Sequence, residues 1–124
     1  MDHTIPVLIV DDFSTMRKKI RNQLKQLGFT SVSEANSGEQ ALHKLRGSDF
    51  KLIISDWNMP DMMGLELLKE VRADIRLKDI PFLLITAASR EPESLTTTDT
   101  GISRWITKPF DTDALKTIID AMLA

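Results

Sequence analysis

The sequence predicts an α/β fold in which five parallel strands form a doubly wound sheet with helices on both faces. Short, continuous apolar runs recur along the chain, most clearly at Val7–Val10, 52–55 and 82–85. Runs of this kind are typical of strands that are buried on both faces. Segments with the spacing of amphipathic helices lie between these runs, so strands and helices alternate.

Size and composition indicate one folded domain spanning residues 1–124, with 42% apolar and 27% charged residues. The formal net charge of −2 lacks the basic excess of a nucleic-acid-binding domain. The absence of cysteine excludes disulfides and thiolate metal sites. The longest apolar runs, of about four residues, are too short to cross a bilayer, and the acidic start is unlike a signal peptide. We therefore expect a cytoplasmic protein with no nucleic-acid or membrane partner.

The first strand, Val7–Val10, is followed by a helix for which Ser14 is the expected N-cap. Four apolar residues form one face of this helix: Met16, Ile20, Leu24 and Leu27. Gly28 is the expected residue after its C-cap, because glycine adopts the left-handed conformation readily. A weaker strand is expected at Val32–Ala35.

The second helix is expected to begin with a capping box of Ser37 and Gln40 and to end near Gly47. The third strand, 52–55, runs directly into Asp56. The helix that follows it has three apolar residues on one face: Leu65, Leu68 and Val71.

A fourth strand is expected at 82–85 and ends in Thr86, and a short fifth strand is expected at 105–106. The closing helix begins near Thr112 and carries Leu115, Ile118, Ile119 and Met122 on one stripe. A helix is also needed between the fourth and fifth strands. The segment 91–100 is rich in threonine, a poor helix former, so we expect that helix to be short or mobile.

Polar side chains follow four of the predicted strands: Asp11 and Asp12, then Asp56, Thr86 and Lys108. The carboxyl ends of parallel strands meet at one edge of the sheet, where α/β folds bind ligands. Three carboxylates in one cleft raise one another's pKa unless a cation neutralises them. Mg²⁺ suits oxygen ligands, and the sequence offers no cysteine or nearby histidine for a softer metal.

A carboxylate nucleophile, a metal, a hydroxyl donor and an ammonium are together suited to accepting a phosphoryl group as an acyl phosphate. Each residue alone has a commoner explanation, since an Asp after a strand usually belongs to a turn, a Thr favours strands and a Lys is usually exposed. Their joint occurrence at matching strand ends favours a site.

The chain resembles the receiver domains of two-component response regulators, and among them the single-domain chemotaxis regulators of the CheY type. The resemblance runs from about Val7 to the C-terminus. Three motifs carry it: 10–17 (VDDFSTMR), 54–60 (ISDWNMP) and 108–110 (KPF). It implies a flavodoxin-like sheet with strand order 2-1-3-4-5, an order that comes from the family, which is a standard example of it, and not from the residues.

The resemblance implies that Asp56 is the phosphoacceptor and receives its phosphoryl group from a phosphohistidine on a CheA-like sensor histidine kinase. Asp12, Asp56 and the backbone carbonyl of Asn58 would hold Mg²⁺, with Asp11 assisting through water. Lys108 would pair with one phosphoryl oxygen and Thr86 would hydrogen-bond another. Such proteins take up the phosphoryl group and autodephosphorylate, but they are signalling proteins and not enzymes acting on an external substrate.

The resemblance also implies a switch that couples Thr86 to Trp105, which stands where the family has a rotating aromatic residue. Movement of Thr86 towards the phosphate makes room for the ring. The surface formed by the helix between strands four and five, the fifth strand and the closing helix then changes its affinity for partners. The Lys108–Pro109 peptide bond is expected to be cis.

Several residues depart from the chemotaxis pattern. Met63 replaces a common acid before the glycine that begins the third helix, so that helix cap is lost or shifted to Asp61. Ala88 replaces an acid at the mouth of the cleft, which leaves the acyl-phosphate lifetime open, and Trp105 is bulkier than the usual Tyr. Three residues differ where chemotaxis regulators contact the flagellar motor switch: Glu91, Ser94 and Thr98.

The overall resemblance favours chemotaxis and control of the flagellar motor as the output. The altered residues at the output surface favour the alternative, a phosphate sink or a regulator of a non-motor partner. A phosphatase is a further partner class that the resemblance allows, and we expect a monomer.

Two other classes use related parts. A haloacid-dehalogenase-type phosphatase places its nucleophile after the first strand in a spaced Asp-x-Asp-x-Thr motif, whereas the acids here are adjacent and no cap domain fits. A flavin-binding domain needs a phosphate loop after the first strand, where this chain has two acids that repel phosphate.

Overall fold

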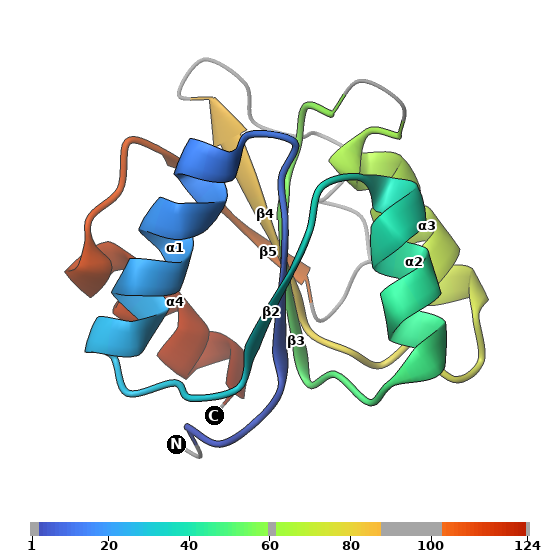
Figure 1. The fold of residues 1–124 in the computed structure, drawn as a ribbon, viewed down its shortest axis with the longest axis horizontal. Helices are drawn as coiled ribbons and strands as arrows, with labels where there is room; N and C mark the ends of the chain where they lie inside the picture. The colour runs from blue at the N-terminus through green and yellow to red at the C-terminus, as the bar shows by residue number, and fades with distance from the viewer. Residues whose placement is uncertain (1–2, 60–61, 88–102, 124) are drawn as a thin grey trace.

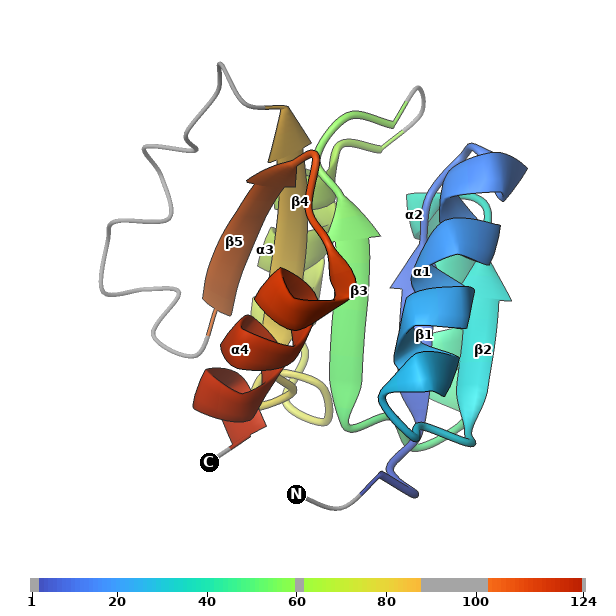
Figure 2. The same cartoon turned by 90° about the vertical axis from the view of Figure 1, so that its left-hand side faces the viewer.

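Five parallel strands lie side by side in the order β2-β1-β3-β4-β5, with α1 and α4 on one face of the sheet and α2 and α3 on the other (Figures 1 and 2). The computed structural model describes residues 3–59, 62–87 and 103–123. In chain order the elements are β1 (Val7–Val10), α1 (Ser14–Gln26), β2 (Val32–Ala35), α2 (Gly38–Gly47), β3 (Leu52–Asp56), α3 (Gly64–Ala73), β4 (Phe82–Ala87), β5 (Ser103–Lys108) and α4 (Thr112–Leu123). The predicted fold class and strand order are confirmed.

Each face of the sheet has its own apolar core, which explains the continuous apolar runs of the strands. On one face, Leu8 and Val10 of β1 belong to a buried cluster with residues of α2 and α3. On the other, Val7 and Ile9 belong to a buried cluster with residues of α1 and α4. The whole of β1 is therefore buried, with side chains pointing alternately to the two cores.

The register of the sheet aligns the carboxyl ends of the strands. Val10 of β1 pairs with Ser55 of β3, and the residues that follow this pair are Asp11 and Asp56. Asp56 pairs with Ile85, and Thr86 pairs with Thr107. The predicted site residues are thus within two residues of a common line across the sheet, with Lys108 the furthest along its strand.

The second helix begins as predicted, with one difference in detail. Ser37 is the N-cap of α2, and its hydroxyl accepts a hydrogen bond from the backbone N–H of Gln40 at 3.1 Å. The side-chain oxygen of Gln40 accepts from the N–H of Asn36 at 2.7 Å, one residue before the cap. The first helix also ends as predicted, with Gly28 at φ +99° after the C-cap Leu27.

The predicted N-cap of the first helix was wrong. Phe13 is the N-cap of α1 and makes no side-chain cap bond, while Ser14 is already the first helical residue. The carboxylate of Asp11 accepts a hydrogen bond from the backbone N–H of Phe13 at 2.9 Å. This bond fixes the turn before α1, so the N-cap is Phe13, one residue before the predicted Ser14. An acid of the predicted site therefore also sets the start of the helix.

Strand lengths were underestimated at three places, the first of them β3, which includes Asp56. β4 extends to Ala87 and β5 spans Ser103–Lys108, so Thr86 and Lys108 lie within the strands they were expected to follow. Both strands continue because their backbones remain paired through these polar residues. In α3, Leu67 joins Leu68 and Val71 on the buried face, and Leu65 is only partly buried.

Several expectations fall outside the described residues. These are the helix expected between the fourth and fifth strands, the cap residue Asp61, and the departures at Ala88, Glu91, Ser94 and Thr98. Within the described ranges, no helix has the length and apolar character needed to cross a membrane.

Candidate functional site

The three predicted acids meet at the carboxyl edge of β1 and β3. Asp11, Asp12 and Asp56 each offer a carboxylate oxygen, and these oxygens all lie within 4.8 Å of one another. Asp11 is fully buried, and Asp56 is 4% exposed. β1 has β2 on one side and β3 on the other, so the acids lie at the point where the strand order reverses.

Two of the clustered carboxylates have oxygens with unmet hydrogen-bonding capacity. Oδ2 of Asp11 and Oδ1 of Asp12 are buried and have no hydrogen-bond partner in the described part of the chain. A buried carboxylate oxygen without a partner carries a desolvation cost. A hard divalent cation with oxygen ligands, such as Mg²⁺, matches both the charge and the donor set. The acidic cluster therefore fits Mg²⁺.

Burial of the cluster disfavours ionisation of Asp11 and Asp56 in the metal-free protein. Burial raises the pKa of Asp11 to about 6, although the N–H of Phe13 acts in the opposite direction and the negative Asp56 adds to the rise. Burial also raises the pKa of Asp56, while Lys108 lowers it. A cation at the cluster would favour the ionised forms of both residues.

Lys108 reaches Asp56 from two strands away. Its Nζ lies 3.1 Å from Oδ1 of Asp56, and the lysine side chain is one-third exposed whereas that of Asp56 is almost fully buried. The peptide bond between Lys108 and Pro109 is cis, as predicted. The structure thus places an ammonium group against one oxygen of the candidate phosphoacceptor.

Thr86 places a hydroxyl at the end of β4 beside this pair. The side chain is fully buried, and its Oγ1 has no hydrogen-bond partner in the described part of the chain. Because Asp56 pairs with Ile85, Thr86 lies one residue further towards the carboxyl edge on the neighbouring strand. A hydroxyl with no internal acceptor is available to an anionic oxygen that binds here.

The remaining predicted residues surround this centre. Trp105 lies on β5, pairs with Leu84 of β4 and packs, partly buried, against the core on the α2 and α3 face. Trp57 is partly buried against the same core and directly follows Asp56. Asn58 is exposed, and the role expected for its backbone carbonyl stays a prediction.

Gly64, the first residue of α3, is a site residue whose importance the sequence did not reveal. Its N–H donates to the carbonyl of Trp57 at 2.8 Å. A Cβ at this position would lie 2.3 Å from the backbone oxygen of Asp56 and 2.8 Å from a methyl of Leu84. Only glycine lets α3 begin directly against the end of β3. The N-cap before it, Met63, makes no side-chain cap bond, as expected from the loss of an acid there.

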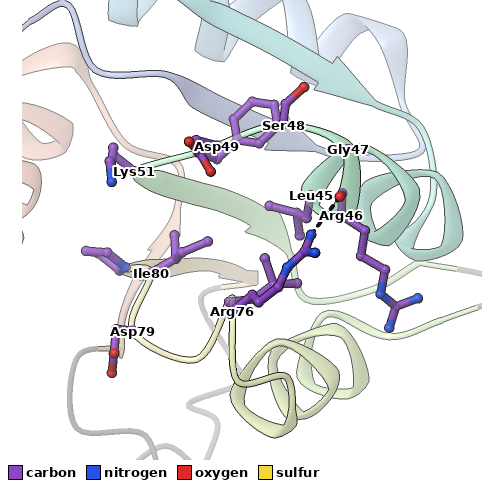
Figure 3. A pocket seen from close by; sticks show the side chains of 12 residues that line it. Leu45, Arg46, Gly47, Ser48, Asp49, Lys51, Arg76, Asp79 and Ile80 are labelled. Atoms are coloured by element: carbon purple, nitrogen blue, oxygen red, sulfur yellow. Dashed lines mark hydrogen bonds between the residues drawn. The ribbon is translucent and has the colours of Figure 1, made fainter.

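A hollow lies at the other end of the sheet. A cavity of about 430 Å³ is lined by the α2–β3 and α3–β4 connections, and Arg76 donates to the backbone oxygen of Arg46 across it at 2.9 Å (Figure 3). None of the predicted site residues lines this cavity.

Residues 7–120 match the response regulator receiver domain family. The chain is 45% identical over 114 residues to the chemotaxis protein CheY of Pseudomonas aeruginosa, covering 92% of each protein. It is 42% identical over 120 residues to the chemotaxis protein CheY-3 of Vibrio cholerae, covering 97% of this chain and 92% of that protein.

Solved structures agree with these sequence relatives. The chemotaxis protein CheY4 of Vibrio cholerae superposes with a TM-score of 0.85 at 33% identity, covering 96% of this chain and 98% of that one. The response regulator TrrA of Thermotoga maritima, solved in complex with Mg(2+)-BeF, gives a TM-score of 0.83 at 29% identity and covers 96% and 99% of the two chains. This chain belongs to the family of response regulator receiver domains.

Proposed function

We propose that this chain is a chemotaxis response regulator that is switched by phosphorylation of Asp56 in a Mg²⁺-dependent reaction. The observation that carries this proposal is the convergence of three acids at one sheet edge, with Asp56 held by Lys108 at 3.1 Å. Membership of the receiver family implies a histidine kinase as phosphodonor. The two chemotaxis relatives at 42% and 45% identity support the pathway.

Asp12, Asp56 and the backbone carbonyl of Asn58 would hold the Mg²⁺, and Asp11 would assist through water. The buried oxygens of Asp11 and Asp12 that have no hydrogen-bond partner among the described residues support this assignment. When bound, Mg²⁺ neutralises negative charge on the carboxylates and on the incoming phosphoryl oxygens. The Mg(2+)-BeF complex of the Thermotoga maritima relative supports the choice of ion.

In the phosphoryl transfer, an oxygen of Asp56 attacks the phosphorus of a phosphohistidine on a CheA-like kinase. The new P–O bond forms as the P–N bond breaks, and the imidazole leaves with the electron pair. Lys108 moves its ammonium group from the carboxylate to a phosphoryl oxygen. The buried hydroxyl of Thr86, which has no hydrogen-bond partner among the described residues, donates to another phosphoryl oxygen. Water later hydrolyses the acyl phosphate, so the protein autodephosphorylates.

Thr86 and Trp105 form the switch that carries the phosphorylation signal to a protein partner. Both residues lie on the β4–β5 pair. Thr86 pairs with Thr107, and Trp105 lies two residues before Thr107 on β5.

The favoured partner is the flagellar motor switch protein, with a phosphatase as a further partner. A monomer of one domain, residues 1–124, performs this role. A phosphate sink or a regulator of a non-motor partner is the alternative output.

Fluorescence of Trp57 tests the site directly, because this residue adjoins Asp56. In a Trp105→Phe background, the protein is titrated with Mg²⁺ and then with beryllofluoride, a phosphoryl mimic, with Asp56→Asn as the control. We expect a saturable Mg²⁺-dependent change that the control loses. A flat response, or acid-labile phosphate on Asp56→Asn after incubation with a phosphorylated kinase, would contradict the assignment.

Lys108→Ala separates uptake from signalling. We expect this variant to accept some phosphate but to lose phosphate-dependent binding of the output partner, because no ammonium group then fixes the phosphoryl oxygen. Binding to a purified motor switch protein, measured with and without beryllofluoride, checks this. Normal phosphate-dependent binding by the variant would remove Lys108 from the switch.

A further inference from the structure

An arginine of α1 holds the peptide group that joins the two adjacent acids of the cluster. Nη1 of Arg17 donates to the backbone oxygen of Asp11 at 2.7 Å, and Nε of the same guanidinium donates to Glu34 at 3.0 Å. The Arg17 side chain is largely buried, with 18% exposed. One planar group therefore connects the acid pair after β1 to the middle of β2.

Glu34 is itself held from both faces of the sheet. Arg21, one helical turn after Arg17, donates to the second carboxylate oxygen of Glu34 at 2.8 Å. Lys44 of α2 donates to the backbone oxygen of Glu34. Because α1 and α2 lie on opposite faces, these contacts fix Glu34 in place, and Glu34 in turn fixes the guanidinium of Arg17 (Figure 1).

The bond to the Asp11 carbonyl matters because of where that carbonyl lies in the chain. It belongs to the peptide plane between Asp11 and Asp12, so rotation of this plane moves the start of the Asp12 side chain. The Asp11 carboxylate is already oriented by the N–H of Phe13. The buried Oδ1 of Asp12 has no partner in the described part of the chain, so contacts to this oxygen do not set its direction.

We propose that Arg17 is a positioning residue that aims the Asp12 carboxylate at the Mg²⁺ site, with Glu34 holding Arg17 in the required orientation. This inference rests on the proposed Mg²⁺-dependent function. Groups that orient metal ligands from outside the coordination shell contribute about 10- to 100-fold to metal affinity.

The direction in which Mg²⁺ affinity changes when Arg17 is removed distinguishes a positioning role from a simple electrostatic effect. Arg17 carries a positive charge close to a cation site, so removing that charge alone would strengthen Mg²⁺ binding. If Arg17 positions Asp12, its removal weakens Mg²⁺ binding instead. The two explanations therefore predict changes in opposite directions.

Arg17→Met and Arg21→Met form a matched pair for the test. Each removes one arginine from α1 and one contact with Glu34, but only Arg17→Met removes the bond to the Asp11 carbonyl. Mg²⁺ affinity is measured from Trp57 fluorescence in the Trp105→Phe background. We expect Kd to rise about tenfold in Arg17→Met and to stay within about twofold of the parent in Arg21→Met. We expect Arg17→Lys to be intermediate, because one ammonium cannot reproduce the guanidinium fork.

A second readout needs no metal. In the metal-free protein, we expect Arg17→Met to speed hydrogen exchange at the Phe13 amide relative to the amides of β1, because Phe13 bonds to Asp11. Glu34→Gln keeps the shape of the side chain but weakens its hold on Arg17, and we expect it to raise the Mg²⁺ Kd in the same direction. It serves as an independent variant if Arg17→Met folds poorly, which urea unfolding reports.

The outcomes are distinguishable. An unchanged or lower Kd in Arg17→Met, or equal losses in Arg17→Met and Arg21→Met, overturns the role of Arg17. Failure of the parent protein to respond to Mg²⁺ or beryllofluoride overturns the proposed function itself. A selective rise of Kd in Arg17→Met, with faster exchange at Phe13, supports the proposal.

Discussion

The two edges of the sheet, where the strands end (carboxyl edge) and where they begin (amino edge), differ in whether their buried polar groups have partners within the protein. At the carboxyl edge, three buried side-chain oxygens lack partners in the described part of the chain: those of Asp11, Asp12 and Thr86. At the amino edge, Nη2 of Arg76 donates to the backbone oxygen of Arg46 at 2.9 Å. Nε of Arg46 lies 3.6 Å from Oδ2 of Asp74 in a salt bridge. The amino edge contains a cavity of about 430 Å³, yet no buried side-chain nitrogen or oxygen of its lining residues lacks a partner in the described part of the chain.

This difference shows that the presence of a cavity does not by itself locate the site in this molecule. Polar groups that are already hydrogen-bonded within the protein gain little from a ligand, whatever the volume of the cavity beside them. Buried oxygens without partners cost stability, and folded proteins keep few of them. Their concentration around Asp56 therefore identifies the edge at which an ion and a phosphoryl group are expected to bind.

The largest expected effect on stability comes from adding one methyl group at the carboxyl edge. In Gly64→Ala the new Cβ meets the backbone oxygen of Asp56 at 2.3 Å, and backbone cannot move aside as a flexible side chain can. We expect a loss of about 3 kcal/mol in the free energy of unfolding, measured with urea, together with weaker Mg²⁺ binding.

Gly47→Ala is the matched substitution at the amino edge. This glycine ends α2, and a Cβ there meets nothing within 4 Å. We expect a neutral effect or a gain of up to about 1 kcal/mol, because alanine favours the helix and restricts the unfolded chain. Equal losses in the two variants would show that the close approach at Gly64 does not constrain the fold.

The pH dependence of stability provides a second way to test the carboxyl edge. The pKa of Asp11 is raised to about 6 in the folded protein, and that of Asp56 is raised as well. Between the unfolded pKa near 4 and about 6, the folded state holds protons that the unfolded state has lost. The metal-free protein should therefore lose about 2 kcal/mol of stability as the pH rises through this window.

Mg²⁺ should reverse that slope, because it favours the ionised carboxylates of the folded state. Urea unfolding at several pH values, with and without the ion, checks both statements. Asp11→Asn removes one of the two groups and should flatten the metal-free curve. A metal-free stability that rises with pH through the window would contradict the raised pKa values.

The sequence correctly predicted that the side chains of the candidate site lie close together, because their location follows from a general property of parallel sheets. Side chains at the carboxyl ends of adjacent strands must converge, so Asp11, Asp56 and Thr86 could be grouped without a structure. It could not predict how these ends are supported. The turn that begins α1 depends on Asp11 reaching Phe13, and the contact of Gly64 with Asp56 depends on how α3 packs against β3.

The same limit applies to Arg17 and Glu34. They are distant in sequence, and the spacing of charges along α1 gives no indication that one arginine reaches a backbone carbonyl while the other only pairs with Glu34. Strand lengths were underestimated for a related reason. Polar residues such as Lys108 interrupt the apolar pattern, although their backbones continue the ladder of β4 and β5.

The smallest expected effect comes from removing the hydroxyl of Thr86. Valine has nearly the same shape, and the buried hydroxyl that it replaces has no partner in the described part of the chain. Thr86→Val should therefore raise the free energy of unfolding of the unphosphorylated protein by about 1 kcal/mol. It should also abolish phosphate-dependent partner binding, because no hydroxyl remains to bond the phosphoryl oxygen.

Thr107→Val is the control for this change, since Thr107 pairs with Thr86 on β5 but is only partly buried. We expect it to change stability by less than about 0.5 kcal/mol and to leave partner binding intact. Urea unfolding and binding with beryllofluoride measure the two properties separately. A less stable Thr86→Val would mean that its hydroxyl is already satisfied before phosphorylation. In that case the contrast between the two edges would rest on the acids alone.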